Sequence, residues 1–247
     1  MTTTPLTRRE RLRAETVEEI QSTARRMLIS DGYDGLSLRA IARAMGMSAP
    51  ALYRYYASRE DLIAALIDEL KTELTESLEK VRDAQPDLVA KLLECSREFR
   101  RWAMAHPAEF TLLFTASAIR LDRPRETGRV DPTGERFGNV FGELITELFL
   151  TRSFPIPADE EIEPELRAQL QEWNDCFPEP LPLGVTQVFL SCWIRLYGTV
   201  SMEVFGQLKF ALSDAGPMFE AELRTLGAML GIGDDYVPPA TGDGWSA

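Results

Sequence analysis

The chain contains 247 residues and carries a formal net charge of −12 at pH 7. This length is sufficient to bury a core without help from disulfides or metals. Three widely separated cysteines, Cys95, Cys176 and Cys192, exclude a Cys-x-x-Cys metal site and a fully paired set of intramolecular disulfides. There is no secretory signal and no apolar run near the roughly 18 residues that cross a bilayer. We therefore expect a cytoplasmic protein with no membrane partner.

The charge is distributed unevenly along the chain. Residues 1–62 contain ten Lys and Arg against eight Asp and Glu, whereas the remainder holds 17 basic and 31 acidic residues. Four arginines between Arg8 and Arg13 form a basic arm suited to following a DNA backbone or entering a minor groove. Taken alone, this arm is explained equally well as a solvated, partly disordered N-terminus. The acidic net charge therefore does not exclude nucleic acid as a partner of the N-terminal part.

The first four predicted helices are bounded by clear start and stop signals. Apolar residues at helical spacing run from Val17 to Leu28, and Asp31-Gly32 ends that helix. Each of the next three helices begins at a serine in the N-cap position, and the last of these serines opens a capping box. We predict these helices at 38–45, 49–55 and 58–80, with N-caps at Ser37, Ser48 and Ser58.

Beyond residue 86 the pattern stays helical and the segments lengthen. Two connections look irregular, at residues 120–131 and 153–163, and the segment from Gly231 onward has the composition of a disordered tail. No alternating strand pattern bounded by turns occurs in the sequence. We therefore predict an all-α fold, with further helices at 87–105, 107–118, 132–152, 164–177, 183–212 and 217–230.

Two short capped helices around a glycine-centred turn predict a helix-turn-helix, whose second helix can enter the major groove. The run from Ser37 to Leu62, SLRAIARAMGMSAPALYRYYASREDL, closely resembles the N-terminal signature of the tetracycline-repressor (TetR) family. The resemblance covers roughly Val17 to Leu70. It implies a three-helix DNA-binding head with the basic arm (1–60), joined by a long helix to a helical ligand-binding and dimerisation domain (61–231), before a disordered tail (232–247).

The resemblance also implies which residues meet DNA. Side chains that match phosphate-contacting positions are Ser37, Tyr53, Tyr55 and Arg59, the last standing where a lysine is usual. Arginine offers the bidentate donors that read guanine, and small apolar side chains contact thymine methyls. The serines would be N-caps with or without DNA, and the tyrosines would also suit a core. The complete predicted DNA-binding set is Ser37, Arg39, Ser48, Ala49, Pro50, Tyr53, Arg54, Tyr55 and Arg59.

The acidic remainder is expected to form the dimer and the ligand pocket. Small residues between Gly198 and Gly206, and an apolar stripe from Phe219 to Leu230, are suited to close helix packing between two subunits. The run from Trp193 to Gly198 also resembles a Trp-x-x-x-His-Gly element of one TetR branch, with Tyr197 in place of the histidine. Aromatic side chains on these helices pack a core or wall a pocket. The candidate ligand-binding residues are Trp102, Phe110, Phe114, Phe141, Phe189 and Trp193.

Two other classes of function, an enzyme and a helical adaptor, fit the sequence less well. An enzyme is disfavoured because His106 is the single histidine of the sequence and because neither a G-x-G-x-x-G motif nor a P-loop occurs. We therefore expect no catalytic residues, no metal and no cofactor. A helical adaptor without specific DNA binding would need neither the arginine arm nor the aligned caps. The sequence thus predicts a ligand-responsive repressor, which binds a pseudo-palindromic double-stranded DNA operator as a homodimer and is released by a small, largely apolar effector.

Overall fold

The computed structural model of the chain describes residues 7–119, 132–175 and 181–239. Within these ranges every regular element is a helix, which confirms the predicted all-α class. Packing divides the chain into a first unit, residues 1–73 with 106–124, and a second unit, residues 74–105 with 125–247. The expected boundary at residue 60 therefore differs from the packing, because the first unit continues along the long helix and takes in a later helix as well.

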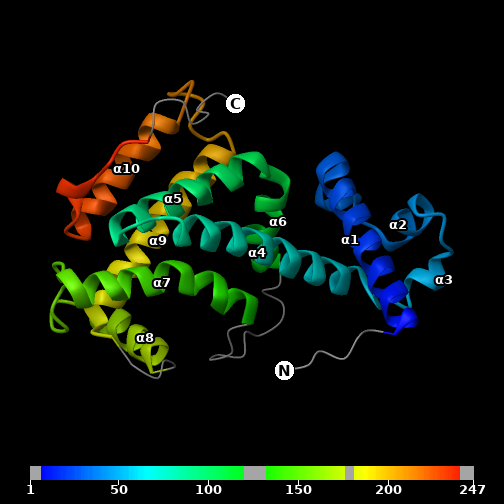
Figure 1. Cartoon of the computed structure of the whole chain (residues 1–247), viewed down its shortest axis with the longest axis horizontal. Helices are drawn as coiled ribbons and strands as arrows, with labels where there is room; N and C mark the ends of the chain where they lie inside the picture. The colour runs from blue at the N-terminus through cyan, green and yellow to red at the C-terminus, as the bar shows by residue number, and fades with distance from the viewer. Residues whose placement is uncertain (1–6, 120–131, 176–180, 240–247) are drawn as a thin grey trace. The chain divides into compact units, whose positions relative to one another are not determined.

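The first unit contains the predicted helix-turn-helix. Its apolar positions on successive helices, including Ile20, Ile41, Leu52 and Leu66, are fully buried, so one small core holds these helices together. Its elements, labelled in Figure 1, are α1 (Arg8–Gly35), α2 (Leu38–Ala44), α3 (Ala49–Leu52), the first part of α4 (Arg59–Asp83) and α6 (Pro107–Ile119).

The basic arm is part of a helix. Thr7 caps α1, because its side chain accepts a hydrogen bond from the backbone N–H of Glu10 while the Glu10 carboxylate accepts one from the Thr7 backbone. The four arginines from Arg8 to Arg13 consequently lie in the first turns of α1, in place of the extended or disordered arm that the sequence suggested. Gly32, at φ 72°, interrupts α1 where the sequence predicted its end.

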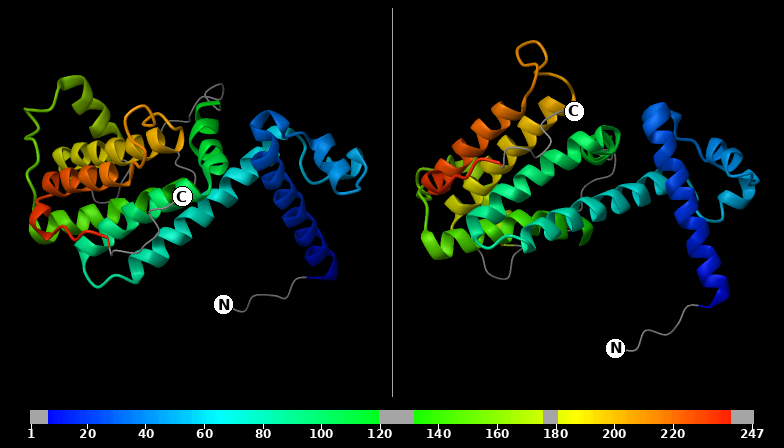
Figure 2. Two further views of the ribbon diagram at one scale, coloured as in Figure 1. Left: turned by 90° about the horizontal axis from the view of Figure 1, so that it is seen from above. Right: turned by 45° about the horizontal axis from the view of Figure 1, so that its top comes forward.

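The second unit is a set of helices packed around α9. This helix contacts α5, α7, α8 and α10, and Figure 2 shows α9 and α10 lying side by side. Buried side chains from these elements, among them Phe99, Leu148, Val200 and Phe219, form its core. Besides the end of α4, its elements are α5 (Leu88–Ala105), α7 (Pro132–Arg152), α8 (Pro164–Asn174), α9 (Leu183–Val204), α10 (Gly216–Met229) and the 3-10 helix η2 (Gly233–Asp235).

Helix α9 is shorter than the predicted 183–212. Gly206 adopts φ 66°, and the N–H of Gln207 bonds to the carbonyl of Met202 at 2.8 Å while the N–H of Gly206 bonds to that of Glu203 at 2.9 Å. This pair of bonds is a Schellman motif, which ends a helix at a left-handed glycine. The sequence predicted a longer helix because apolar residues continue beyond Gly206. The glycine nevertheless ends the helix there.

The predicted tail is ordered over its first part. Residues 233–235 form η2, and Tyr236 and Val237 contact buried groups of the second unit, so the prediction of disorder from residue 232 is wrong as far as residue 239. The polar and proline-rich composition concealed these specific contacts. Residues 240–247, the predicted irregular connection 120–131, Cys176 and the predicted helix end at Phe177 lie outside the described residues.

Membrane-spanning helices and clusters of metal ligands are both missing from the described residues. No helix in them has the combined length and apolar character needed to cross a membrane. In the same ranges, no group of three or more His, Cys, Asp and Glu side chains is arranged to hold a metal ion. Cys95 and Cys192 are buried free thiols.

Candidate nucleic-acid interface and ligand cavity

The turn between α2 and α3 presents the short helix α3 at the surface of the first unit. Ser37 caps α2 as predicted, since its Oγ accepts a hydrogen bond from the N–H of Ala40 at 3.2 Å. Gly46, at φ 67°, ends α2, and the N–H of Met47 bonds to the Ala42 carbonyl at 2.8 Å. Ser48 occupies the N-cap position of α3, but its side chain makes no capping hydrogen bond.

The predicted DNA-binding residues run from Ser37, the N-cap of α2, through α3 and the turn after it to Arg59, the first residue of α4. Tyr53 is 46% exposed, and the guanidinium of Arg13 lies over the ring of Tyr55, 5.1 Å from its centre. The first turns of α1 therefore add a cation next to the end of α3. The predicted residues that are exposed are Arg39, Ser48, Pro50, Tyr53 and Arg54, and those that are half-buried are Ser37, Ala49, Tyr55 and Arg59.

Arg59 is engaged inside the first unit. Its Nε donates to the carbonyl of Leu36 and its Nη2 to the carbonyl of Tyr33, both at 2.6 Å. Its guanidinium also lies over the ring of Tyr33, 4.4 Å from the centre. These bonds satisfy carbonyl groups at the end of α1. The geometry thus gives Arg59 a positioning role between α1 and α4, whereas the sequence suggested a phosphate contact.

A buried ionic cluster fixes α6 within the first unit. Arg25 of α1 bonds to Glu73 of α4 at 2.5 Å and to Glu109 of α6 at 3.1 Å, and Glu109 is only 2% exposed. The hydrogen bonds to Glu73 and the nearby negative charges raise the pKa of Arg25 against the opposing effect of burial, so this arginine stays charged. Sequence reasoning missed the cluster because its members are far apart in the chain.

A small, partly open apolar cavity lies between α5, α7, α9 and α10 of the second unit, with a volume of about 50 Å³. Its walls come from five segments of the chain, the fifth being the residues that follow α10. The lining residues are Leu92, Leu93, Ser96, Phe141, Ile145, Phe189, Cys192, Trp193, Leu196, Leu223, Leu226, Gly227, Leu230 and Ile232.

The structure brings only part of the predicted ligand-binding set together. Phe141, Phe189 and Trp193 line the cavity. Trp102 is buried elsewhere in the second unit, and Phe110 and Phe114 belong to α6 in the first unit, where their ring centres lie 4.7 Å apart. Aromatic density alone could not separate core from pocket. The missed aliphatic lining on α10 does carry a signal, the apolar stripe from Phe219 to Leu230, which the sequence analysis assigned to dimerisation.

Comparison with known proteins places these features in a family. A model described as "Bacterial regulatory proteins, tetR family" matches residues 20–66, and one described as "Tetracyclin repressor-like, C-terminal domain" matches residues 92–226. HTH-type transcriptional regulator Rv1816 of Mycobacterium tuberculosis is 31% identical over 231 residues, which are 90% of this chain and 93% of that protein. This chain belongs to the TetR family. It is therefore a DNA-binding, ligand-responsive transcriptional regulator, and a helical adaptor is not favoured.

Solved structures share the fold of this chain. The crystal structure of the regulatory protein SCO4313 superposes with a TM-score of 0.67 at 28% identity, covering 89% of this chain and 98% of that one. A TetR family transcription regulator from Marinobacter aquaeolei VT8 has a TM-score of 0.52 at 16% identity, with 89% and 96% covered, and shares the fold. The similarity to SCO4313 extends over both units, so the helix-turn-helix and the helices around the cavity belong to one family architecture.

The cavity of this TetR-family protein offers an uncharged lining. Its polar atoms come from Ser96, whose hydroxyl donates to the Leu92 carbonyl at 2.8 Å, and from Cys192. Burial raises the pKa of the Cys192 thiol to about 11, so the thiol is protonated at neutral pH. Such a surface favours an uncharged apolar ligand and disfavours an ionised one.

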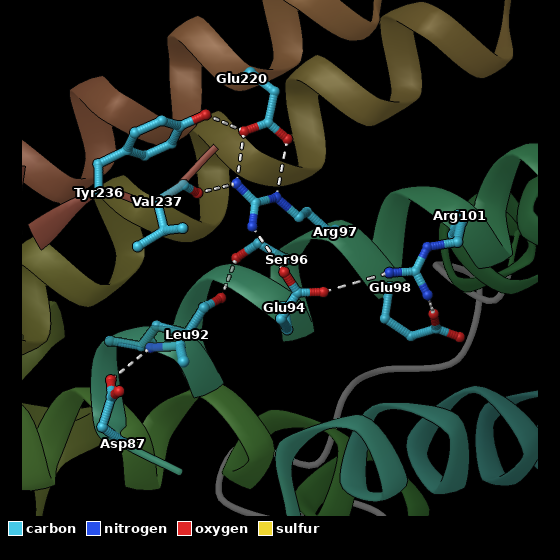
Figure 3. A network of polar contacts seen from close by, with 11 residues as sticks. Asp87, Leu92, Glu94, Ser96, Arg97, Glu98, Arg101, Glu220, Tyr236 and Val237 are labelled. Carbon is cyan, nitrogen blue, oxygen red and sulfur yellow. Dashed lines mark hydrogen bonds and ion pairs between the residues drawn. The ribbon is translucent and has the colours of Figure 1, made fainter. Parts of the chain in front are cut away.

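An ionic network lies beside this cavity in the second unit (Figure 3). Arg97 of α5 donates to both carboxylate oxygens of Glu220 on α10, at 3.0 and 2.9 Å, and to Glu94 at 2.7 Å. Its Nη2 also donates to the carbonyl of Val237 at 2.7 Å, and the Tyr236 hydroxyl donates to Glu220. Burial alone would lower the pKa of Arg97, but these carboxylates outweigh it and raise the pKa. The arginine is thus a permanently charged anchor for three segments.

A wider hollow of about 290 Å³ lies between α4 and α7 in the second unit. Its charged side chains largely pair with each other: Arg136 bonds to Glu79, and Arg82 lies 3.6 Å from Glu143. A ligand in this hollow would have to compete with those ion pairs and with water. The apolar cavity is therefore the better candidate for an effector site.

Proposed function

We propose that this chain is a cytoplasmic, non-enzymatic repressor that binds a pseudo-palindromic operator as a homodimer and is released by a small uncharged apolar effector. The observation that carries the effector class is the apolar cavity, whose lining contains no charged side chain. The DNA-binding part of the proposal rests on the exposed Arg39 of α2 and on the exposed Tyr53 and Arg54 directly after α3. Coupling between them is assigned to α4, because this one helix contributes residues to both units.

The proposed DNA contacts divide by chemistry. Ser37 accepts a capping bond through its Oγ and keeps a hydroxyl proton that can be donated to a phosphate at the start of α2. Tyr53 and Tyr55 are assigned to the backbone, and the exposed side chains of Arg39 and Arg54 to guanine edges in the major groove. Arg59 is excluded from this proposed set because it bonds to backbone carbonyls of its own chain.

Selection of bound sites from a random DNA pool, followed by affinity measurements on variants, tests these contacts. Arg54→Ala should cost about 1–3 kcal/mol on the selected site and relax the preference at one base pair. Tyr53→Phe, the matched control for a backbone contact, should weaken binding to selected and unrelated DNA by similar factors. Equal losses for Arg54→Ala on both kinds of DNA would show that Arg54 does not read a base.

The proposed dimer uses α9 and α10. On α9, Ile194 is 67% exposed and Met202 is 45% exposed. Phe205, the C-cap of α9, is 42% exposed, and Met218 on α10 is 43% exposed. These positions recur at helical spacing, and Gly198 lies between them with open space where a side chain would stand. Two copies related by a twofold axis can bury this apolar face, and the half-sites of the operator should lie about 35 Å apart, or farther if two dimers share the site.

Sedimentation at micromolar concentration tests the dimer. Ile194→Arg should shift the chain toward monomer because it introduces a charge into the apolar face. Leu150→Arg is the matched control, since Leu150 is 72% exposed and belongs to α7, which is not part of the proposed interface. A wild-type monomer, or equal dissociation of both variants, argues against this interface.

Release by the effector follows from a difference in affinity between two states. A coupling of about 1–3 kcal/mol changes operator affinity roughly 5- to 150-fold. Reciprocity supplies the test, because saturating operator must weaken effector binding by the same factor by which the effector weakens operator binding. A molecule that fills the cavity and leaves operator affinity unchanged would contradict the sensor assignment while leaving DNA binding intact.

A further inference from the structure

The cavity is too small for a typical effector as it stands. Its volume of about 50 Å³ holds a few water molecules. An apolar cavity that accepts a benzene ring measures about 150 Å³. A ring-sized molecule can therefore enter only if a side chain of the wall moves away.

One wall residue differs from the others in how it is held. The lining from α5, α7, α9 and α10 belongs to regular helices, whereas Ile232 follows α10 in a segment that includes η2. Ile232 is 2% exposed, and its Cγ1 lies 3.7 Å from the point where a side chain on Gly227 would begin. We name residues 231–237 the C-terminal latch. Its apolar contribution to the cavity wall is this single isoleucine.

Polar contacts hold the C-terminal latch in place (Figure 3). Figure 3 shows that the carbonyl of Val237 accepts a hydrogen bond from Arg97, at 2.7 Å, and that the Tyr236 hydroxyl donates to Glu220. In addition, Asp235 pairs with Arg152. The bonds of Val237 and Tyr236 are part-buried and the Asp235 pair is exposed. Each group that opening releases can bond to water instead, so the net cost of the exchange is small. The latch can therefore detach more readily than a helix of the wall can.

Detachment leaves the buried charges compensated. Arg97 keeps both bonds to Glu220 and its bond to Glu94 when Val237 leaves, and Glu220 keeps Arg97 when Tyr236 leaves. No buried charge becomes unpaired, which is the expensive event in a protein interior. The Arg97–Glu220 pair is thus a fixed base on which the latch opens and closes.

From these contacts we propose that Ile232 fills part of the effector's place, and that an uncharged ring-sized molecule binds by displacing Ile232 together with the C-terminal latch. This inference rests on the proposed effector function of the cavity. The lining selects against ionised molecules because it contains no charged side chain, and the neighbouring cation, Arg97, is bound to Glu220 and Glu94. The latch sets the size of what enters, and the uncharged lining sets its charge.

Titration of the full chain with toluene, followed by calorimetry, tests the proposal. Ile232→Ala should raise toluene affinity at least about tenfold, because the ligand then fills space that the isoleucine occupied. Ile162→Ala is the matched control: Ile162 is also 2% exposed but belongs to a different cluster, with Leu170 and Leu183. It should leave toluene affinity unchanged. Benzoate, which has the same ring and a negative charge, should bind neither variant.

A second variant leaves the apolar packing intact. Tyr236→Phe removes only the hydrogen bond to Glu220 and should raise toluene affinity at least about threefold by populating the open latch. Toluene affinity that is unchanged in both Ile232→Ala and Tyr236→Phe overturns the proposal, and so does an equal gain in Ile162→Ala or equal binding of benzoate. Operator affinity is measured separately. Toluene that binds as expected without releasing DNA refutes the sensor function but supports the latch.

Discussion

The two units build their candidate sites in different ways. In the first unit the site is a single stretch from Ser37 to Tyr55, shaped by caps and one tight turn. In the second unit the cavity takes residues from five segments spread between Leu92 and Ile232. A buried ionic network ties three of these segments together: α5, α10 and the residues after α10. The first arrangement preserves a fixed surface for a DNA groove. The second can change shape, because its walls depend on contacts between distant parts of the chain.

The largest expected effect comes from removing the buried ion pair of the second unit. Arg97→Met should lower the free energy of unfolding by about 3–5 kcal/mol, because it leaves Glu220 buried at 7% exposure without its partner. The double variant Arg97→Met, Glu220→Met should recover most of that loss. Urea denaturation measures both. Arg101→Ala is the surface control, since Arg101 is 56% exposed and pairs with Glu98, and it should cost no more than about 1 kcal/mol.

Recovery in the double variant matters more than the size of the first loss. If both the single and the double variant are equally destabilised, the network contributes through its packing and its ties to Tyr236 and Val237, and the charge pairing is secondary. The segments of the second unit would then be held together by packing, and the charge pairing would not distinguish the second unit from the first.

A close backbone approach gives the next effect in size. A Cβ on Gly184, in the first turn of α9, would lie 2.4 Å from the carbonyl oxygen of Pro157 and 2.9 Å from the Cβ of Ile156. Gly184→Ala should therefore destabilise the second unit by about 1–3 kcal/mol. Gly138→Ala on α7 is the control, because nothing lies within 4 Å of that position. It should stabilise the chain by up to about 1 kcal/mol. A loss at both positions would point to helix distortion in place of the predicted clash.

These contacts show which parts of the structure can be derived from sequence. The helix-turn-helix of the first unit was predictable because each helix start and stop signal acts over a few residues: Ser37 caps α2, and Gly46 ends it. In the second unit, helix positions were predictable from apolar spacing, but the cavity was not. Phe110 and Phe141 look alike in sequence, yet one is core in the first unit and the other lines the cavity. The C-terminal latch was missed because its order comes from Arg97, far away in the chain.

Arg59 tests the sequence-based assignment within the first unit. The family resemblance suggested that it contacts a DNA phosphate, whereas in the structure it bonds to carbonyls at the end of α1. Arg59→Ala should lower the free energy of unfolding by about 1–2 kcal/mol through the loss of two bonds to the carbonyls of Tyr33 and Leu36. Arg59→Lys should recover less than half of it, since an ammonium lacks the forked donors. Operator affinity of the folded Ala variant should change less than that of Tyr53→Phe. Normal stability with clearly weakened DNA binding would restore the phosphate assignment.

The smallest expected effect separates two serines that look equivalent in sequence. Both precede a short helix, but Ser37 Oγ accepts the N–H of Ala40 at 3.2 Å, whereas the Ser48 side chain makes no capping bond. Ser37→Ala should therefore cost about 1 kcal/mol of unfolding free energy, and Ser48→Ala should stay within about 0.5 kcal/mol of wild type.

DNA binding should rank these two variants differently from stability. Ser48 is exposed at the start of α3, the helix assigned to the major groove, so its hydroxyl is available to a base or a phosphate. Ser48→Ala should then weaken operator binding without a matching loss of stability, while Ser37→Ala lowers both. Denaturation and operator titration on the same two variants measure this. Equal stability losses would mean that Ser48 caps α3 in solution, and the surface of the first unit would then depend on local capping at both helices.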